Sequence, residues 1–200
     1  MMRSHRDHDR RSMRWRGFDY ASEGTYFVTI CIHGRCPLLG DVQNNDVSLS
    51  PAGAMVTQTW EALPERFGNL AVRNHVVMPN HFHGLLVLGR DVAGLDPSSW
   101  VFSDPINSSH GRTSVAGTAH GSLGRTVQAF KSLTTHAYMQ GVRSSGWPPF
   151  AGRLWQRGYY DRVVRDLDEL GAVVEYIRMN PVQWAQDPYH LQTDTRPSSA

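Results

Sequence analysis

Residues Asn74–Leu88 read NHVVMPNHFHGLLVL, two apolar stretches separated by a Pro-Asn dipeptide at 79–80. Proline and asparagine adopt turn dihedrals at little cost, so this segment predicts a β-hairpin. Side chains alternate between the two faces of a strand, which places His81 and His83 on one face and Phe82 on the other. The hairpin therefore presents two imidazoles side by side at the start of its second strand.

Two neutral imidazoles one strand repeat apart can bind a single divalent cation. The same pattern also occurs as a pair of solvated histidines on a sheet face, and the spacing alone leaves both interpretations open. A rigid hairpin, an arginine-rich chain and a later helix that carries Tyr176 and Asn180 favour the metal site.

The elements before and after the hairpin alternate between strand and helix patterns. Ser50-Pro51 supplies an N-cap and a proline at the first helical position, which predicts the start of a helix. A loop with a short strand is expected over 41–49. The expected strands cover Thr25–Ile32, Asn69–Val77, His81–Leu88 and a short stretch that ends the irregular segment 154–165, and the second helix covers Leu123–Met139.

The last helix has a clear start and a clear end. Asp166 and Glu169 form a capping-box pattern, and Pro181 ends the helix. Tyr176 and Asn180 are one turn apart and are therefore stacked on one flank. A tyrosine at the edge of an apolar stripe is more often core packing than chemistry. The predicted stripe consists of Leu167, Leu170, Val173, Val174 and Ile177.

Composition indicates a folded protein of 200 residues with 40% hydrophobic residues and a net charge of +2. No apolar run approaches the roughly 20 residues of a membrane span, and the N-terminus has no apolar signal core. Cys31 and Cys36 are too few for a disulfide framework. These features predict a cytoplasmic protein that does not enter a membrane.

Basic residues are almost all arginine, since Lys131 is the only lysine among 20 basic residues. Guanidinium groups bind phosphate oxygens in pairs, which suits contacts to nucleic acid. Residues 1–17 predict a disordered basic arm, with a merely solvated tail as the alternative. The residues expected to contact nucleic acid are Arg14, Arg16, Arg125, Lys131, Arg157, Arg162 and Arg165.

Segment boundaries follow from composition. The folded domain is expected over 18–182, interrupted by a flexible insertion at 91–121 that is dense in Gly, Ser, Pro and Asp. Residues 183–200 are expected to form a C-terminal tail that opens with a short helical turn. The aromatic and basic residues of 154–165 fit either stacking on unpaired bases or core packing.

Three separated motifs in this order resemble a known family. The segment 78–83, MPNHFH, followed by an apolar strand, is similar to the His-hydrophobic-His signature of the IS200-like single-tyrosine (HUH) transposases. The segments 155–163, WQRGYYDRV, and 176–181, YIRMNP, resemble the REP-associated tyrosine transposases of that group. The resemblance runs from about residue 17 to residue 182.

This resemblance implies an α+β, ferredoxin-like domain: an antiparallel sheet with helices on one face, and a C-terminal helix that carries the catalytic tyrosine. It implies that Tyr176 is the nucleophile and that His81, His83 and Asn180 bind Mg²⁺ or Mn²⁺. The implied activity is cleavage and rejoining of single-stranded DNA at hairpin-associated sites through a 5′-phosphotyrosine intermediate.

Two other classes remain as alternatives. One is an RRM-like module that binds single-stranded nucleic acid without catalysis, and the other is a metal-dependent hydrolase in which water replaces Tyr176 as the nucleophile. Under the main interpretation the partner is single-stranded DNA with a stem-loop, and the protein is a monomer or a homodimer.

Overall fold

The computed structural model describes residues 23–89 and 122–190. The predicted basic arm at 1–17, with Arg14 and Arg16, lies outside the described residues. So do the predicted insertion at 91–121 and the last ten residues of the predicted tail.

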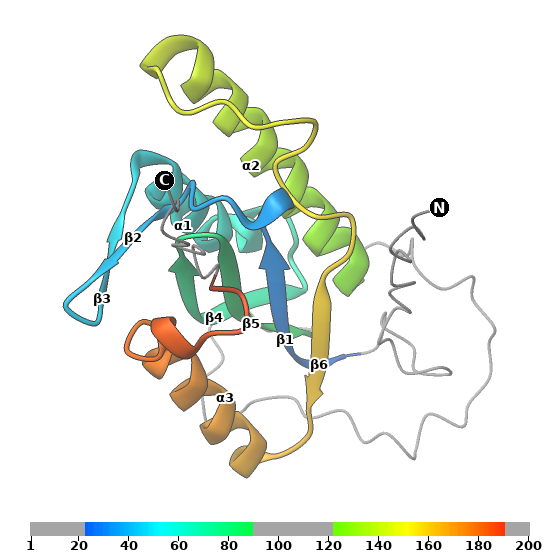
Figure 1. Cartoon of the computed structure of the whole chain (residues 1–200). Coiled ribbons are helices and arrows are strands. Elements are labelled where there is room, and N and C mark those ends of the chain that lie inside the picture. Colours follow the sequence, from blue (N-terminus) through cyan, green and yellow to red (C-terminus); the bar gives the residue numbers. More distant parts are fainter. Residues whose placement is uncertain (1–22, 90–121, 191–200) are drawn as a thin grey trace, which may run out of the picture.

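One antiparallel sheet of four strands forms the centre of the described structure (Figure 1). Its order is β4-β5-β1-β6, and β1 pairs antiparallel with both β5 and β6. The strands are β1 (Gly24–Cys31), β4 (Leu70–Met78), β5 (His81–Leu88) and β6 (Tyr160–Val164). The bounds of β5 agree with the sequence prediction, and those of β1 and β4 differ from it by one residue.

Within residues 23–89 and 122–190, three α-helices pack on this sheet, α1 (Pro51–Glu61), α2 (Leu123–Ser145) and α3 (Leu167–Met179). The chain order β1, α1, β4, β5, α2, β6 with the observed strand order is the ferredoxin-like arrangement, and α3 follows it. The predicted fold class is therefore confirmed.

The period-two alternation of the strands separates two apolar cores. Tyr26, Val28 and Phe82 belong to the larger core, which also contains Trp60 from α1 and Phe130 from α2. The smaller core is on the opposite face and joins Leu85 and Val164 of the sheet to Leu170, Val173 and Ile177 of α3. Helices α1 and α2 thus cover one face of the sheet, and α3 covers part of the other face.

The region 41–49, expected as a loop with a short strand, is a hairpin of two strands, β2 (Gly40–Gln43) and β3 (Asp46–Leu49). Asn44 and Asn45 at its tip have φ of 52° and 64°. Positive φ at both central residues is what a tight hairpin turn requires, and asparagine tolerates it better than most residues. The signal was present in the sequence as an Asn-Asn pair.

Helix caps follow the sequence. The Ser50 hydroxyl accepts from the Gly53 amide, and the Asp166 carboxylate accepts from the Glu169 amide at 2.7 Å. The Glu169 carboxylate accepts from the backbone N–H of Arg165 rather than from that of the cap residue. Leu167, predicted within the apolar stripe of α3, is instead 64% exposed, because it is the first residue of the helix and precedes the turn that meets the sheet.

The second helix extends beyond the predicted end at Met139 and stops at Gly146, whose φ is 69°. Its last turns pack against the following segment, where a Cβ on Gly141 would meet the Trp147 ring at 2.3 Å. Short 3₁₀ turns cover His33–Arg35, Leu63–Glu65 and Trp184–Gln186. Within 23–89 and 122–190, no helix has the length and apolar character needed to cross a membrane.

Gly84→Ala should destabilise the fold by about 1–3 kcal/mol, because an added Cβ would lie 2.6 Å from the Trp60 ring and 2.8 Å from the Phe82 ring. Gly171→Ala on α3 is the matched control. Its Cβ meets nothing within 4 Å, and alanine favours the helix by about 0.5–1 kcal/mol. Denaturant unfolding of both variants measures the two effects. A Gly84→Ala protein as stable as the wild type would contradict the packing of Trp60 on β5.

Candidate metal and tyrosine site

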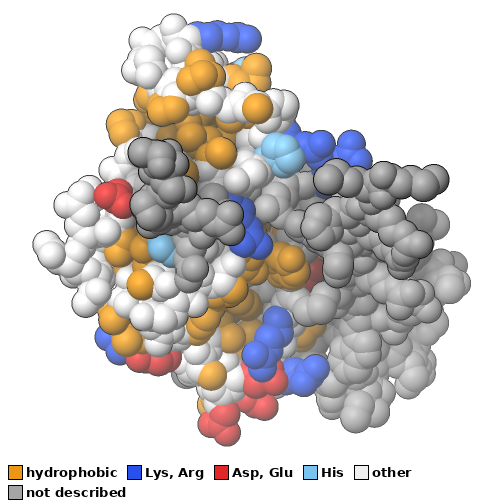
Figure 2. Space-filling model, viewed as in Figure 1, with side chains coloured by type: hydrophobic (Ala, Val, Ile, Leu, Met, Phe, Trp, Pro, Cys, Tyr) orange, Lys and Arg blue, Asp and Glu red, His pale blue; other side chains and the backbone are white. Residues whose placement is uncertain are grey.

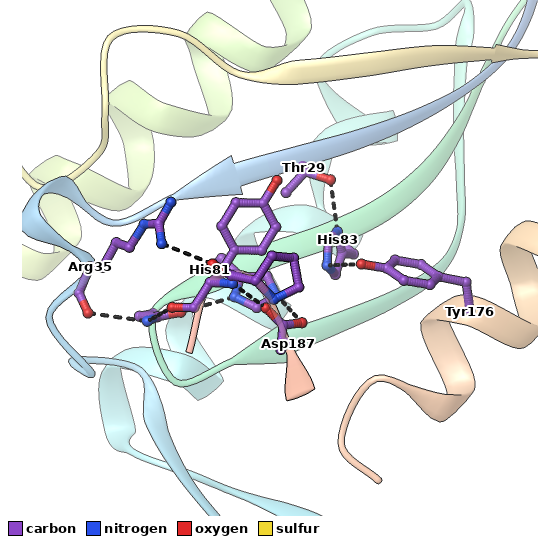
Figure 3. A network of polar contacts seen from close by, with 9 residues as sticks. Thr29, Arg35, His81, His83, Tyr176 and Asp187 are labelled. Atoms are coloured by element: carbon purple, nitrogen blue, oxygen red, sulfur yellow. Dashed lines mark hydrogen bonds and ion pairs between the residues drawn. The ribbon is translucent and has the colours of Figure 1, made fainter. Parts of the chain in front are cut away.

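His81 and His83 share one face of the sheet, as the alternation predicted, and α3 packs on this face (Figure 3). Both are buried, with 0% and 1% exposure, and their ring centroids are 4.6 Å apart. His83 Nδ1 is 2.8 Å from the Thr29 hydroxyl on the neighbouring strand β1, and His81 Nδ1 is 2.9 Å from the Asn80 carboxamide oxygen. The Nε2 atoms remain for other partners.

Asp187 completes a group of three side chains that can hold a metal ion. One ligand atom from each of His81, His83 and Asp187 lies within 4.8 Å of the others, and all three residues are buried. The carboxylate Oδ2 is 3.9 Å from His81 Nε2. Two atoms bound to one metal at about 2.0–2.2 Å can be no more than about 4.4 Å apart, so this separation fits a shared ion.

Asp187 was not among the predicted site residues, and it falls in the region expected as a tail. After α3 the chain forms the predicted short helical turn, Trp184–Gln186, and then folds back over the histidines. The Tyr189 ring packs 4.8 Å from the His81 ring, and Arg35 Nη1 donates to the Pro188 carbonyl. The aromatic residues of this segment could have indicated that it is folded, since a solvated tail rarely contains them.

Tyr176 and Asn180 of α3 reach the same site, as the stacking on one helix flank predicted. The Tyr176 hydroxyl is 3.5 Å from His83 Nε2 (Figure 3), and the two rings meet edge to face at 5.2 Å. Tyr176 is 37% exposed, whereas Asn180 is buried. A pocket of about 380 Å³ opens beside both residues and is also bordered by Gln183, Gln186 and Asp187.

Burial controls the protonation of this group. It lowers the pKa of His81 to about 3 and that of His83 well below its ordinary value, so both imidazoles are neutral at physiological pH. It raises the pKa of Tyr176 and that of Asp187. The Asn180 side chain opposes the pKa shifts of His81, Tyr176 and Asp187, and it borders the same pocket as Tyr176 and Asp187.

Two buried polar atoms of the site have no hydrogen-bond partner among the described residues, His81 Nε2 and Asn180 Oδ1. Neutral imidazole nitrogens, a carboxylate and an amide oxygen are all metal ligands, and a buried acceptor without a donor is costly. A divalent cation would satisfy both atoms. The residues present therefore fit a metal, with Asp187 added to the predicted set.

An uncharacterized protein of Haemophilus influenzae is 32% identical over 187 residues, which cover 92% of this chain and 94% of that protein. The chain belongs to the same family as this Haemophilus protein. No protein-family model matches the chain.

The solved structure of a REP-associated tyrosine transposase bound to a REP hairpin aligns with 87% of this chain and 75% of its own, at a TM-score of 0.54 and 16% identity. The chain therefore shares the fold of this tyrosine transposase. The resemblance inferred from three sequence motifs is thereby confirmed. A transposase candidate from Deinococcus radiodurans R1 aligns over 82% of this chain and 95% of its own, at 15% identity and a TM-score of 0.42.

Basic residues of this transposase fold lie in different settings. Arg125 at the start of α2 and Arg157 before β6 are exposed. Arg162 and Arg165 both pair with Glu169, at 3.1 Å and 3.6 Å. Figure 2 shows basic and acidic side chains next to one another at this end of the molecule. These four arginines are at the surface, although two of them share one carboxylate.

Lys131, also predicted to contact DNA, makes several contacts within the described structure. Its ammonium donates to the carbonyls of Gln156, Arg157 and Gly158 at 3.0, 3.3 and 2.7 Å. It also lies 5.5 Å from the centre of the Tyr159 ring. Burial lowers the pKa of Lys131 to about 8. The side chain thus fastens the segment before β6 to α2, and this placement does not favour a phosphate contact.

Lys131→Met should lower the stability by about 1 kcal/mol, because three carbonyls lose a shared charged donor. The exposed Arg125→Met on the same helix should change it by less than about 0.5 kcal/mol. Urea unfolding measures both. An unchanged stability of Lys131→Met, combined with weaker binding of single-stranded DNA, would favour the DNA contact predicted from sequence.

Proposed function

We propose that the protein cleaves and rejoins single-stranded DNA through a covalent bond to Tyr176, with a divalent cation held by His81, His83 and Asp187. One observation carries the proposal: the Tyr176 hydroxyl lies 3.5 Å from Nε2 of His83, a member of a buried group of metal-binding side chains. Asn180, one turn further along α3, is proposed as a further ligand.

Tyr176 suits a nucleophile because its position is rigid. It lies on a helix with a capped start, held to the sheet by Val173 and Ile177, and its ring edge meets Phe27 at 5.9 Å. Its partial exposure leaves a path for a phosphodiester, and a reacting oxygen must be within about 3–3.5 Å of its target. Of the other tyrosines nearby, Tyr160 has its ring centroid 6.3 Å from that of Tyr189, and the Tyr159 ring lies 5.5 Å from the Lys131 ammonium.

The proposed step exchanges one phosphoester for another. The Tyr176 oxygen forms a bond to the phosphorus while the bond from phosphorus to the 3′ oxygen breaks. The products are a 5′-phosphotyrosine and a free 3′-hydroxyl, and the proton lost by tyrosine is balanced by the one gained by the departing oxygen. Reversal with a second 3′-hydroxyl rejoins the strand without ATP.

The cation, Tyr176 and the ligand residues would each contribute differently to this reaction. A bound divalent cation would favour the phenolate and stabilise the charge that develops on the phosphate. Burial raises the pKa of Tyr176, which keeps the hydroxyl protonated when no cation is near. Two neutral imidazoles with a carboxylate make a mixed nitrogen and oxygen set, which fits Mn²⁺ better than the oxygen-preferring Mg²⁺.

The proposed substrate is single-stranded DNA with a stem-loop. Support comes from the exposed arginines near β6 and from the structural neighbour, which was solved with a REP hairpin. The arginines proposed to contact the DNA backbone are Arg14, Arg16, Arg125, Arg157, Arg162 and Arg165. A non-catalytic RRM-like module and a hydrolase that uses water are the outcomes to be distinguished from this proposal.

Tyr176→Phe should bind a labelled single-stranded hairpin oligonucleotide as the wild type does, yet form no adduct that survives denaturation, because only the attacking oxygen is removed. Tyr160→Phe, a matched change at an exposed tyrosine of β6, should still form the adduct. Denaturing gel electrophoresis with Mn²⁺ and peptide mapping of the adduct provide the measurement. An adduct mapped to Tyr159 or Tyr160 would overturn the assignment, and cleavage by Tyr176→Phe would favour a water nucleophile.

His83→Ala and Asp187→Ala should each weaken Mn²⁺ binding by more than about 100-fold, since loss of a ligand should exceed the roughly 10- to 100-fold effect of losing an outer-shell partner. Asn180→Ala should weaken it to a smaller degree. Asp168→Ala, an exposed carboxylate in the first turn of α3, is the control and should have no effect. Titration calorimetry of the metal-free chain measures these affinities. Unchanged binding by His83→Ala would place the ion elsewhere.

A further inference from the structure

Asn80, at the turn between β4 and β5, makes three side-chain hydrogen bonds and is 2% exposed. Its Nδ2 donates to the carbonyl of Arg35 at 3.1 Å and to that of Tyr189 at 2.8 Å. Its Oδ1 lies 2.9 Å from Nδ1 of His81. One carboxamide thus contacts a histidine of the metal group, the 3₁₀ turn after β1 and the segment that carries Asp187.

These partners determine how the carboxamide is oriented. Carbonyl oxygens only accept, so the two groups that face Arg35 and Tyr189 must be the N–H bonds of Nδ2. A flipped amide would set its oxygen against both carbonyls. The remaining Oδ1 only accepts, so Nδ1 of His81 must carry the proton of the neutral ring. Nε2 then holds the lone pair.

We propose that Asn80 is a positioning residue that fixes the tautomer of His81, so that Nε2 is free for a metal, and that ties the Asp187 segment to the same turn. The inference rests on the proposed metal site but not on the proposed cleavage of DNA. It assigns a role beyond turn formation to the asparagine that precedes the first histidine.

Asn80 also bonds to the C-terminal segment, which is distant from it in the sequence. Tyr189 is 109 residues from Asn80 along the chain, and its neighbour Pro188 accepts from the Arg35 guanidinium at 2.9 Å. The Tyr189 amide donates in turn to Asp187 Oδ1. The side chain that orients one ligand therefore also holds the backbone that delivers another.

Thr29 provides the comparison within the same site. Its hydroxyl is 2.8 Å from Nδ1 of His83, but a hydroxyl can donate or accept, so this contact alone does not select a tautomer. The backbone oxygen of Asn80 accepts from Ile32 whatever the side chain is. Substitutions at Asn80 can therefore separate the role of its carboxamide from the main-chain contact of the turn.

The test is nitrogen NMR of the histidine rings in the metal-free full chain at mildly alkaline pH, with His81→Gln used to assign the signals. In the wild type the His81 proton should be on Nδ1. It should stay there in Asn80→Asp, whose carboxylate still accepts, and should distribute over both nitrogens in Asn80→Ala. Thr29→Val, the matched control, should leave the His81 tautomer unchanged.

Two further measurements separate the two halves of the role. Asn80→Ala should weaken Mn²⁺ binding by about 10- to 100-fold, the usual effect of losing an outer-shell partner. Asn80→Asp, which retains the acceptor but loses the Nδ2 donors, should speed hydrogen exchange of the amides over 187–190.

A wild-type His81 protonated on Nε2, or an Asn80→Ala protein with the wild-type tautomer and Mn²⁺ affinity, would overturn the proposal. If Asn80→Ala does not fold, the wild-type tautomer and the exchange of Asn80→Asp still decide it. A wild-type protein that binds no Mn²⁺ but carries the proton on Nδ1 would overturn the metal site and leave the tautomer role of Asn80 supported.

Discussion

Burial of two imidazoles against one sheet face is the constraint on which the rest of the site depends. Desolvation disfavours the charged ring, so His81 and His83 stay neutral, and each neutral ring then needs a defined partner for Nδ1. Thr29 on β1 and Asn80 at the hairpin turn supply these partners. The strand pairing and the hairpin turn therefore bring one hydrogen-bond partner to Nδ1 of each ring.

The two faces of the sheet differ in composition because successive side chains of each strand point to opposite faces. The face of Phe82 is closed by α1 and α2 into a large apolar core, where Trp60 packs 4.7 Å from Phe82. In the described part of the chain, the other face carries a smaller apolar core beneath α3, next to the buried polar residues Thr29, His81 and His83. The large core can stabilise the buried polar group on the opposite face of the same strands.

The nucleophile candidate is placed by packing that has no chemical role of its own. Leu170, Val173 and Ile177 attach α3 to the sheet, and this fixes the flank on which Tyr176 projects toward His83. The Asp166 cap defines where the helix begins, and Pro181 follows its end. The C-terminal segment then returns over the site and adds Asp187.

The sequence alone predicted the fold class, through the family resemblance, and most residues of the candidate site, through local patterns. Period-two alternation placed His81 and His83 on one face, helical spacing stacked Tyr176 with Asn180, and the cap pattern located the start of the last helix. The motif order led to the transposase fold, which the solved neighbour confirms. Leu167 was misplaced because apolar character does not reveal that the first helical residue precedes the packed turn.

Only the tertiary structure decided which distant residues complete the site. Asp187 lies beside the histidines because Arg35 and Asn80 donate hydrogen bonds to the backbone carbonyls of Pro188 and Tyr189. Every residue has a backbone carbonyl, so the sequence does not show which of them will accept such a bond. Lys131 looks like any basic residue, yet its ammonium is used by three carbonyls of the segment before β6. Contacts to the main chain depend on where the chain passes, and that is fixed by packing rather than by any local pattern.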